Sequence, residues 1–242
     1  MPESEGVMSK ERKPWSRIYS RTHLTGFRYY RRLELIRQLL NPHISSETRL
    51  LDLGCGDGTW LRYVSRHIGY GVGIDVGWNN ATEEWSSPPE NIVLKKGDFF
   101  TCCIDAELFD VVCCFETLEH FRDPYSVICL MKKCLKPGGI AVISVPIEIG
   151  PSVLVKQLVA KATRYNRDAT WTLMELVNAV FYNVGEIKKQ RATSEYGGEK
   201  GFDYRDIENL FNQNFQNVRY RGTPFPVFGK LLNVGLIYLG LK

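Results

Sequence analysis

The run Leu50-Leu51-Asp52-Leu53-Gly54-Cys55-Gly56-Asp57-Gly58-Thr59 decides the fold of this chain, because an apolar strand ends there in three alternating glycines. Glycine tolerates positive φ and has no Cβ, so this spacing predicts close contact between the main chain and a ligand. We expect Thr59 to cap a helix that runs to about His67. A strand, a glycine-rich turn and a helix N-terminus form the first half of a nucleotide-binding βαβ unit.

The second half of this unit follows at the expected distance. Residues 71–75 read as a short strand ending in Asp75, about 20 residues after the first glycine, where a carboxylate can accept hydrogen bonds from both ribose hydroxyls. The dinucleotide fingerprint has glycine at the sixth position counted from Gly54, and this chain has Thr59 there. A dehydrogenase that binds a pyrophosphate is therefore disfavoured.

Strands and helices continue to alternate along the chain. We expect strands at 91–95, 109–115 and 140–145, and a helix at 124–135 that ends at the Lys136-Pro137-Gly138-Gly139 turn. The nearly continuous apolar run at 109–115 is typical of a central parallel strand covered on both faces. The pattern predicts an α/β, doubly wound, mainly parallel sheet whose ligands bind at the carboxyl ends of the strands.

The alternation breaks after residue 146. Residues 147–200 read as a helical insertion with helices at 153–164 and 172–184 and a polar tract at 188–200. The second helix carries one apolar stripe, made of Leu173, Leu176, Val177, Val180, Phe181 and Val184. This stripe either packs on the sheet or the first helix, or it belongs to a lid over a substrate pocket with a hinge at 196–201.

A helix at 203–211 and strands at 216–220 and 234–241 close the expected fold. The link at 223–229, rich in proline and aromatic residues, either reaches the carboxyl edge of the sheet or covers its side. With 242 residues, 44% of them hydrophobic, and no internal repeat, we expect a single domain over residues 1–242.

Composition limits the cellular setting. No apolar run reaches the roughly 20 residues that span a bilayer, and residues 1–13 have no apolar signal core, so we expect a cytoplasmic protein. The cysteines show no C-x-x-C spacing and read as small buried hydrophobic residues rather than as metal ligands, and no metal is expected. They are Cys55, Cys102, Cys103, Cys113, Cys114, Cys129 and Cys134.

Positive charge is concentrated near the N-terminus. Residues 10–40 hold nine Lys or Arg against two Glu, a charge of +7 in a chain of net charge +4. Apolar residues recur there at helical spacing, which predicts an amphipathic helix with a basic outer face. That face is either simply solvated or attracts phosphate in RNA, an anionic lipid or a diphosphate-linked substrate, including peripheral contact with the inner face of a membrane.

Four separated motifs now resemble those of the class I S-adenosylmethionine-dependent methyltransferases, in the order that family has them. They are Asp52-x-Gly54-x-Gly56-x-Gly58, Asp75 at the end of strand two, Gly97-Asp98-Phe99 after strand three, and Leu135-Lys136-Pro137-Gly138-Gly139 before strand five. The resemblance covers about residues 49–145, with plausible closing strands to residue 241. It implies a Rossmann-like sheet of seven strands with the last one antiparallel, and S-adenosylmethionine as cofactor.

The resemblance also implies roles for individual residues. The glycines would approach the methionine and ribose portion, Asp75 would bind the ribose, and Asp98 would accept from the adenine amino group beside Phe99. Asp52, with carbonyl groups near Phe115 and Glu116, would help hold the methionine ammonium. The implied cofactor-binding set is Asp52, Gly54, Cys55, Gly56, Gly58, Asp75, Val76, Asp98, Phe99, Phe115 and Glu116.

Candidate catalytic residues follow strand four. A sulfonium methyl is already activated, so transfer mainly needs an acceptor held in line, with a base where the acceptor is a hydroxyl. Glu116, Glu119 and His120 have i, i+3, i+4 spacing, which would place them near one face of a helical turn. The run is similar to that of ubiquinone-pathway O-methyltransferases and of metal-binding small-RNA 2′-O-methyltransferases, but the further His of the RNA enzymes is missing. We expect His120 and Glu116 to be catalytic, with capping or packing of His120 as the alternative.

The leading hypothesis is methyl transfer from S-adenosylmethionine to a small-molecule, lipid-linked or sugar-linked acceptor, on oxygen more readily than on carbon or nitrogen. Two alternatives stay open: an RNA-directed methyltransferase, although nucleic acid is a disfavoured partner, and a non-catalytic partner protein that binds S-adenosylmethionine. The acceptor, the methylated atom and the oligomeric state do not follow from the sequence.

Overall fold

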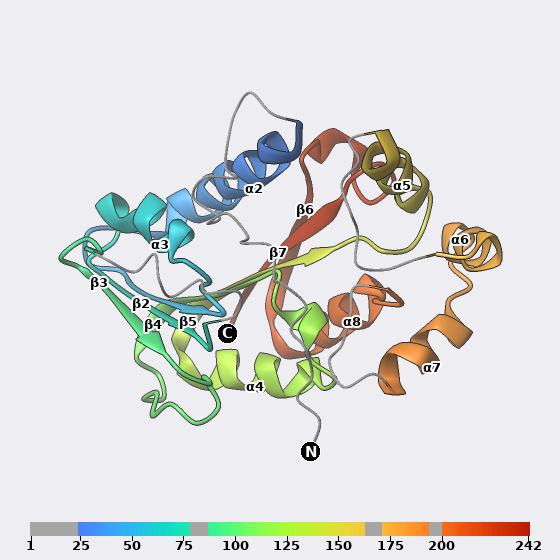
Figure 1. The fold of residues 1–242 in the computed structure, drawn as a ribbon. Helices are drawn as coiled ribbons and strands as arrows, with labels where there is room; N and C mark the ends of the chain where they lie inside the picture. Colours follow the sequence, from blue (N-terminus) through green and yellow to red (C-terminus); the bar gives the residue numbers. More distant parts are fainter. Residues whose placement is uncertain (1–23, 78–86, 163–170, 194–199) are drawn as a thin grey trace, which may run out of the picture.

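The computed structural model describes residues 24–77, 87–162, 171–193 and 200–242, and it has one seven-stranded sheet at its centre (Figure 1). The strand order is β3-β2-β1-β4-β5-β7-β6. The strands are β1 (Arg49–Leu53), β2 (Tyr70–Asp75), β3 (Ile92–Lys96), β4 (Phe109–Phe115), β5 (Leu135–Pro146), β6 (Gln216–Thr223) and β7 (Gly235–Leu241). β7 pairs antiparallel to both of its neighbours, while β1 to β5 pair in parallel. The predicted fold class is confirmed.

Helices cover both faces of this sheet (Figure 1). α2 (Leu24–Leu40) and α3 (Thr59–Val64) lie over one face, and α4 (Pro124–Cys134) and α8 (Tyr204–Asn214) lie over the other. The insertion after β5 contributes α5 (Ser152–Ala162), α6 (Leu173–Val180) and α7 (Gly185–Thr193). Short 3-10 helices are η1 (Asn41–His43), η2 (Ser65–His67), η4 (Leu118–His120) and η5 (Pro226–Phe228). No described helix is long and apolar enough to cross a bilayer.

Alternation along each central strand divides the buried residues between two cores. On β1, Leu51 and Leu53 pack in the cluster under α4 and α8, while Leu50 packs with α2 and α3. On β4, Val112 faces the first cluster and Val111 the second. A strand that is apolar on both faces needs helices on both faces, and this fixes the sheet in the middle of the molecule.

The carboxyl edge of the sheet collects the loops that the sequence singles out. Pro146 at the end of β5 pairs with Gly235, which pairs in turn with Thr223 at the end of β6. The β6–β7 link therefore begins at the edge where β1, β2, β4 and β5 also end. Of the two predicted positions for this link, the structure has the one at the carboxyl edge.

Several local predictions need correction. Thr59 is the first helical residue and not the cap, because Gly58 occupies the N-cap position and Asp57 accepts hydrogen bonds from the Thr59 N–H and hydroxyl. The expected turn at Lys136–Gly139 lies inside β5. Leu135, the first residue of β5, pairs with Phe109, and the register shifts before Val111 pairs with Ile140. The polar tract predicted at 188–200 begins inside a helix, because residues 188–193 belong to α7. This helix is anchored to the start of α8, where Lys188 contacts Asp203 at 2.7 Å and Asp206 at 2.9 Å.

The insertion also differs from its predicted packing. α6 ends at Val180, and Leu173 and Phe181 of the predicted stripe are 78% and 76% exposed, so the stripe does not pack as a whole on the sheet or on α5. Val184, by contrast, is buried. The predicted hinge at 196–201 lies outside the described residues except for its last two positions, and residues 10–23 of the basic segment lie outside them as well.

Candidate functional site

The glycine-rich turn after β1 has the backbone geometry that its sequence predicts. Gly54, Gly56 and Gly58 have φ values of +76°, +56° and +74°. The N–H groups of Gly54 and Cys55 both donate to the carbonyl oxygen of Ile74, at 2.8 and 3.2 Å, so the turn is fixed to the end of β2. A Cβ on Gly54 would lie 2.4 Å from the Thr117 Oγ1 atom, which places the turn against the segment that follows β4.

Asp52 is a buried acid, and one of its two carboxylate oxygens lacks a hydrogen bond. It is the second-last residue of β1 and is 2% exposed. Its Oδ1 atom has no hydrogen bond. Burial, with a smaller contribution from the negative charge of Asp75, raises the pKa of Asp52 to about 8. A buried carboxyl group in this state is complementary to a cation that would restore its charge and its missing hydrogen bond.

Asp75 at the end of β2 connects two loops. Its Oδ2 atom accepts from the Gly56 N–H at 2.9 Å, and its Oδ1 atom accepts from the Gly77 N–H at 2.7 Å. The side chain therefore lies across the glycine-rich turn, where a ribose bound to that turn would meet it. Val76, the next residue, is 55% exposed.

The end of β3 presents one polar and one apolar side chain. Asp98 is exposed, and its Oδ1 atom accepts from the Phe100 N–H at 2.9 Å. Phe99 is 5% exposed and stacks with Phe100 and Phe121, with ring centroids 4.9 and 5.5 Å away. Phe99 is thus a core residue that fixes the loop, while Asp98 remains accessible to a ligand.

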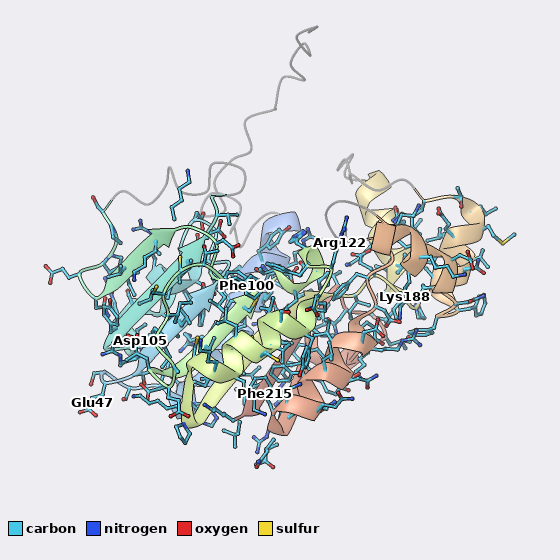
Figure 2. All side chains as sticks on the ribbon, turned by 90° about the horizontal axis from the view of Figure 1, so that it is seen from below. Glu47, Phe100, Asp105, Arg122, Lys188 and Phe215 are labelled. Carbon is cyan, nitrogen blue, oxygen red and sulfur yellow. The ribbon has the colours of Figure 1, made fainter. Side chains whose placement is uncertain are left out.

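An open hollow of about 380 Å³ lies next to this loop. Figure 2 shows Phe100 and Arg122 near the N-terminal end of α4, where the hollow is found. Its lining residues are Phe100, Phe121, Arg122, Asp123 and Ser126.

Glu116, directly after β4, is held by two side chains from distant parts of the chain. Its Oε2 atom lies 2.9 Å from Nη1 of Arg32 in α2, and its Oε1 atom accepts from the Ser144 hydroxyl at 3.1 Å. Glu116 has φ +48°, a left-handed conformation that is rare for a non-glycine residue. Next to it, the Thr117 hydroxyl donates to the Phe115 carbonyl oxygen at 2.9 Å, one of the carbonyl groups expected near the methionine ammonium.

The expected helical alignment of Glu116, Glu119 and His120 is wrong. Glu116 precedes the 3-10 turn η4, in its left-handed conformation, and points to Arg32. Glu119 is 2% exposed, whereas the His120 side chain is 58% exposed, with 4.0 Å between His120 Nε2 and Glu119 Oε1. A 3-10 turn has three residues per turn, so it aligns residues i and i+4 less well than an α-helix does. Glu116, with its left-handed backbone, lies before this turn and does not share its face.

The remaining titratable groups near the sheet do not suggest metal or thiol chemistry. Among the residues that the structure describes, no group of three or more His, Cys, Asp or Glu could hold a metal ion. Burial raises the pKa of the Cys55, Cys113 and Cys114 thiols well above the usual range, which disfavours the nucleophilic thiolate. Cys103 is exposed and is an exception to the expected burial.

The basic face of α2 is less open than its sequence suggests. Arg28 donates to the Tyr29 hydroxyl at 2.6 Å, and Arg31 pairs with Glu34 at 2.7 Å within the helix. Arg32 is directed to Glu116, as described above. Three of the four arginines of α2 therefore have partners within the protein.

These residues fit S-adenosylmethionine. The glycines hold the turn after β1 in left-handed conformations, the unpartnered Asp52 oxygen is suited to an ammonium group, and Asp75 lies beside this turn, where ribose hydroxyls would need acceptors. Asp98 completes a row of acids along the ends of β1, β2 and β3. When bound, the cofactor supplies an activated sulfonium methyl group, and the protein has to hold it and orient the acceptor.

The comparisons agree with this geometry. The family model described as "Methyltransferase domain" matches residues 24–184. The chain belongs to this methyltransferase family. It has the class I, Rossmann-like fold, and its cofactor is S-adenosylmethionine.

Curated relatives of this methyltransferase match it over less than half of its length. The ubiquinone biosynthesis O-methyltransferase of Hahella chejuensis is 38% identical over 100 residues, which are 38% of this chain and 40% of that protein. A probable methyltransferase of Aspergillus luteorubrus is 32% identical over 127 residues, 46% of this chain and 44% of that protein. The ubiquinone biosynthesis O-methyltransferase of Coxiella burnetii is 33% identical over 119 residues, 44% of this chain and 49% of that protein. The chain thus spans about half the length of these relatives or less.

Solved structures extend the likeness of fold to nearly the whole methyltransferase. An S-adenosylmethionine-dependent methyltransferase from Mesorhizobium loti has a TM-score of 0.58 at 17% identity, covering 86% of this chain and 96% of that one. One from Aquifex aeolicus has a TM-score of 0.54 at 15% identity, covering 95% and 99%. At these identities the likeness concerns the fold alone.

Three residues of this site did not stand out in the sequence of the methyltransferase. Arg32 lies among nine basic residues, and nothing in its spacing singles it out. Thr117 lies two residues beyond the end of β4 and Ser144 two residues before the end of β5, and neither belongs to a recognisable motif. Ser144 is recognisable only through the register, which pairs it with Phe115 and so brings it beside Glu116.

Proposed function

We propose that this methyltransferase transfers the methyl group of S-adenosylmethionine to a hydroxyl oxygen of a small acceptor, with a phenolic acceptor on an isoprenoid tail as the best-supported class. The observation that carries the proposal is the acid and glycine arrangement at the ends of β1 and β2, where the Oδ1 atom of Asp52 has no hydrogen-bond partner. The Hahella and Coxiella relatives are named as O-methyltransferases of ubiquinone biosynthesis. These names support oxygen as the methylated atom and a phenolic acceptor.

A hydroxyl acceptor has to lose a proton as its oxygen attacks the sulfonium methyl, while sulfur leaves with the bonding electrons as a thioether. His120 is our proposed base. It lies at the end of η4 beside the carboxyl edge and is exposed, so its imidazole can reach an acceptor and pass the proton to solvent. The Glu116 carboxylate is already engaged by Arg32 and Ser144, which makes it the weaker of the two catalytic candidates.

The test is methyl transfer from labelled cofactor to catechol that carries a geranyl chain. We expect product with the wild-type protein. In Asp75→Ala we expect cofactor affinity at least about 10-fold weaker, because the N–H groups of Gly56 and Gly77 lose the carboxylate that fixes them and the ribose loses its proposed acceptor. Asp98→Ala, at an exposed position, should weaken binding less. Calorimetry measures both affinities, and unchanged binding in Asp75→Ala would contradict the site. Cofactor binding with no product from any hydroxylated extract fraction would favour the non-catalytic alternative.

We further propose that the protein contacts an anionic membrane through an apolar edge surface. This surface consists of exposed apolar residues on α5, α6 and the β6–β7 link: Leu154, Val155, Leu158, Leu173, Met174, Val177, Phe181, Phe225, Val227, Phe228, Leu231 and Leu232. The insertion that holds α5 and α6 and the β6–β7 link both leave the sheet at its carboxyl edge. There the Ile147 N–H donates to the Val234 carbonyl oxygen at 3.0 Å. Exposed Arg219 and Arg221 on β6 precede the link and match anionic headgroups.

Vesicle flotation tests this contact. We expect vesicles with phosphatidylglycerol to retain the wild-type protein at low salt and to lose Val227→Asp/Phe228→Asp, because two charges would enter the apolar interface. Tyr125→Asp, at an exposed position on α4, is the control and should float like wild type. Absence of flotation for the wild-type protein would reject the membrane contact and leave the enzyme proposal standing.

The RNA-directed alternative has little support in the contacts. With three of the four α2 arginines engaged, we expect weak RNA binding with a shallow dependence on salt concentration. A steep loss of affinity between 50 and 200 mM salt, the behaviour of a protein that contacts several phosphates, would favour that alternative.

A further inference from the structure

The helix α5 buries polar side chains while exposing apolar ones, unlike an ordinary surface helix. Its polar residues Ser152 and Lys156 are 1% and 9% exposed, while Leu154 and Leu158 on its outer side are 42% and 68% exposed. Ser152 and Lys156 are four residues apart and so lie on one face of the helix. Val153 of α5 is fully buried as well, so the inward face combines an apolar residue with two polar ones, and burial of apolar surface alone would not place the polar pair there.

A second charged residue meets this inward face. The chain leaves β5 through Ile147, Glu148 and Ile149, all fully buried, and the Nζ atom of Lys156 lies 2.6 Å from Oε1 of Glu148. The Ser152 hydroxyl, on the same face, is buried without a hydrogen-bond partner. Nε2 of Gln157, the residue after Lys156, is also buried without one.

A buried ion pair is a weak source of stability, because removing two charges from water costs about as much as their attraction returns. Apolar residues of similar volume would serve a purely structural purpose at least as well. The unpartnered Ser152 hydroxyl adds a further cost that a ligand could remove. These two features together point to a group that enters from outside.

The position suits the methyl acceptor. Glu148 is two residues beyond the end of β5, and β5 is separated from β1 by β4 alone. With a strand spacing of about 4.8 Å, the ends of β1 and β5 are roughly 10 Å apart, a distance that the cofactor and an aromatic acceptor together can cover.

We propose that Glu148, Lys156 and Ser152 form a subsite that binds a neutral hydroxyl group of the acceptor, next to the hydroxyl that receives the methyl. A hydroxyl group both donates and accepts hydrogen bonds. It can therefore donate to the Glu148 carboxylate and accept from the Lys156 ammonium. The pair has no net charge, so it offers neither a carboxylate ligand nor an ammonium ligand a net electrostatic attraction. The subsite thus selects acceptors with two adjacent hydroxyls. This inference rests on the proposed function, since it assumes a hydroxylated acceptor.

The test compares two probes, catechol and phenol that each carry a geranyl chain. We expect the wild-type protein to prefer the catechol by about 10- to 100-fold in kcat/KM, because the phenol lacks the hydroxyl that would bond to the pair and to the buried Ser152 hydroxyl, which stays without a partner. In Glu148→Leu/Lys156→Leu the preference should fall to about one. Replacing both charges avoids the unpaired buried charge that either single variant would create. The control is Glu186→Ala/Lys189→Ala, which removes an exposed pair of 2.7 Å from α7 in the same insertion and should keep the preference.

Circular dichroism melting and cofactor calorimetry must show that the double variant folds and binds S-adenosylmethionine. A folded double variant that keeps the wild-type preference would make Glu148–Lys156 a structural pair and overturn the subsite alone. A wild-type protein without preference between the probes would overturn it as well. If the wild-type protein methylates neither probe, the phenolic acceptor of the proposed function fails, and the subsite fails with it.

Discussion

Asp52→Asn is expected to melt at a higher temperature than the wild-type protein at pH 8 and to lose most of its affinity for S-adenosylmethionine. The folded-state pKa of Asp52 is about 8, against 3.8 for the ordinary carboxyl group. Between these values the folded protein keeps a proton that the unfolded chain has released, so wild-type stability falls as the pH rises through this window. The amide has no such dependence, and the difference in stability should grow from pH 5 to pH 8.

The loss of affinity has a separate cause. An ammonium group that binds here would pair with the Asp52 carboxylate, and the amide offers a neutral acceptor instead, so we expect an affinity weaker by about 10-fold or more. Calorimetry in two buffers of different ionisation enthalpy at pH 7 should also show proton release on binding to wild type and none with the variant. Asp57→Asn is the control, because its amide oxygen can still accept from Thr59. Equal pH dependence of the Asp52 variant and wild type would contradict the raised pKa.

Gly54→Ala is expected to destabilise the protein by about 2 to 5 kcal/mol and to abolish detectable cofactor binding. The backbone of Gly54 has φ +76°, which costs roughly 1–2 kcal/mol for a residue with a Cβ. The new Cβ would also lie 2.4 and 2.6 Å from Oγ1 and Cγ2 of Thr117, an overpacking that typically costs about 1–3 kcal/mol. Relief of this contact has to move Thr117, whose hydroxyl donates to the Phe115 carbonyl oxygen.

Gly138→Ala separates these two effects. Gly138 has nearly the same φ, +74°, but a Cβ there would meet nothing within 4 Å, so only the backbone strain remains. We expect a smaller destabilisation in this variant, with unchanged cofactor affinity. Thr117→Ala introduced into Gly54→Ala should restore part of the stability by making room. Equal losses in the two glycine variants would show that the contact with Thr117 does not matter.

The placement of the candidate cofactor-binding residues at one edge of the sheet was predictable because its determinants are local. The glycine run, Asp75 and Asp98 each follow a strand whose apolar pattern is readable, and strand order then places them at one edge. The same reasoning predicted β4 and a last strand at β7, whose antiparallel direction was implied by the resemblance to class I methyltransferases. It failed where conformation depends on distant partners: α7 carries few apolar residues and is positioned by Lys188 and its contacts with Asp203 and Asp206.

The acceptor half was less predictable because its determinants come from packing. The left-handed φ of Glu116 and its contact with Arg32 depend on where α2 settles, and the spacing of Glu116, Glu119 and His120 predicted a helical face that does not form. The orientation of α5 is a further example. Periodicity reports which residues share a face of a helix and does not report which face is turned inward.

The outward-facing side chains of α5 and α6 also affect how melting of this protein has to be followed. Fluorescent dyes that report unfolding respond to apolar surface in contact with water, a property usually taken as the mark of loosened, partly folded states. Here Leu158, Leu173 and Phe181 present such surface in the native fold. A dye-based melt should therefore start from a bright baseline and fade as vesicles cover these side chains, while circular dichroism would follow unfolding itself.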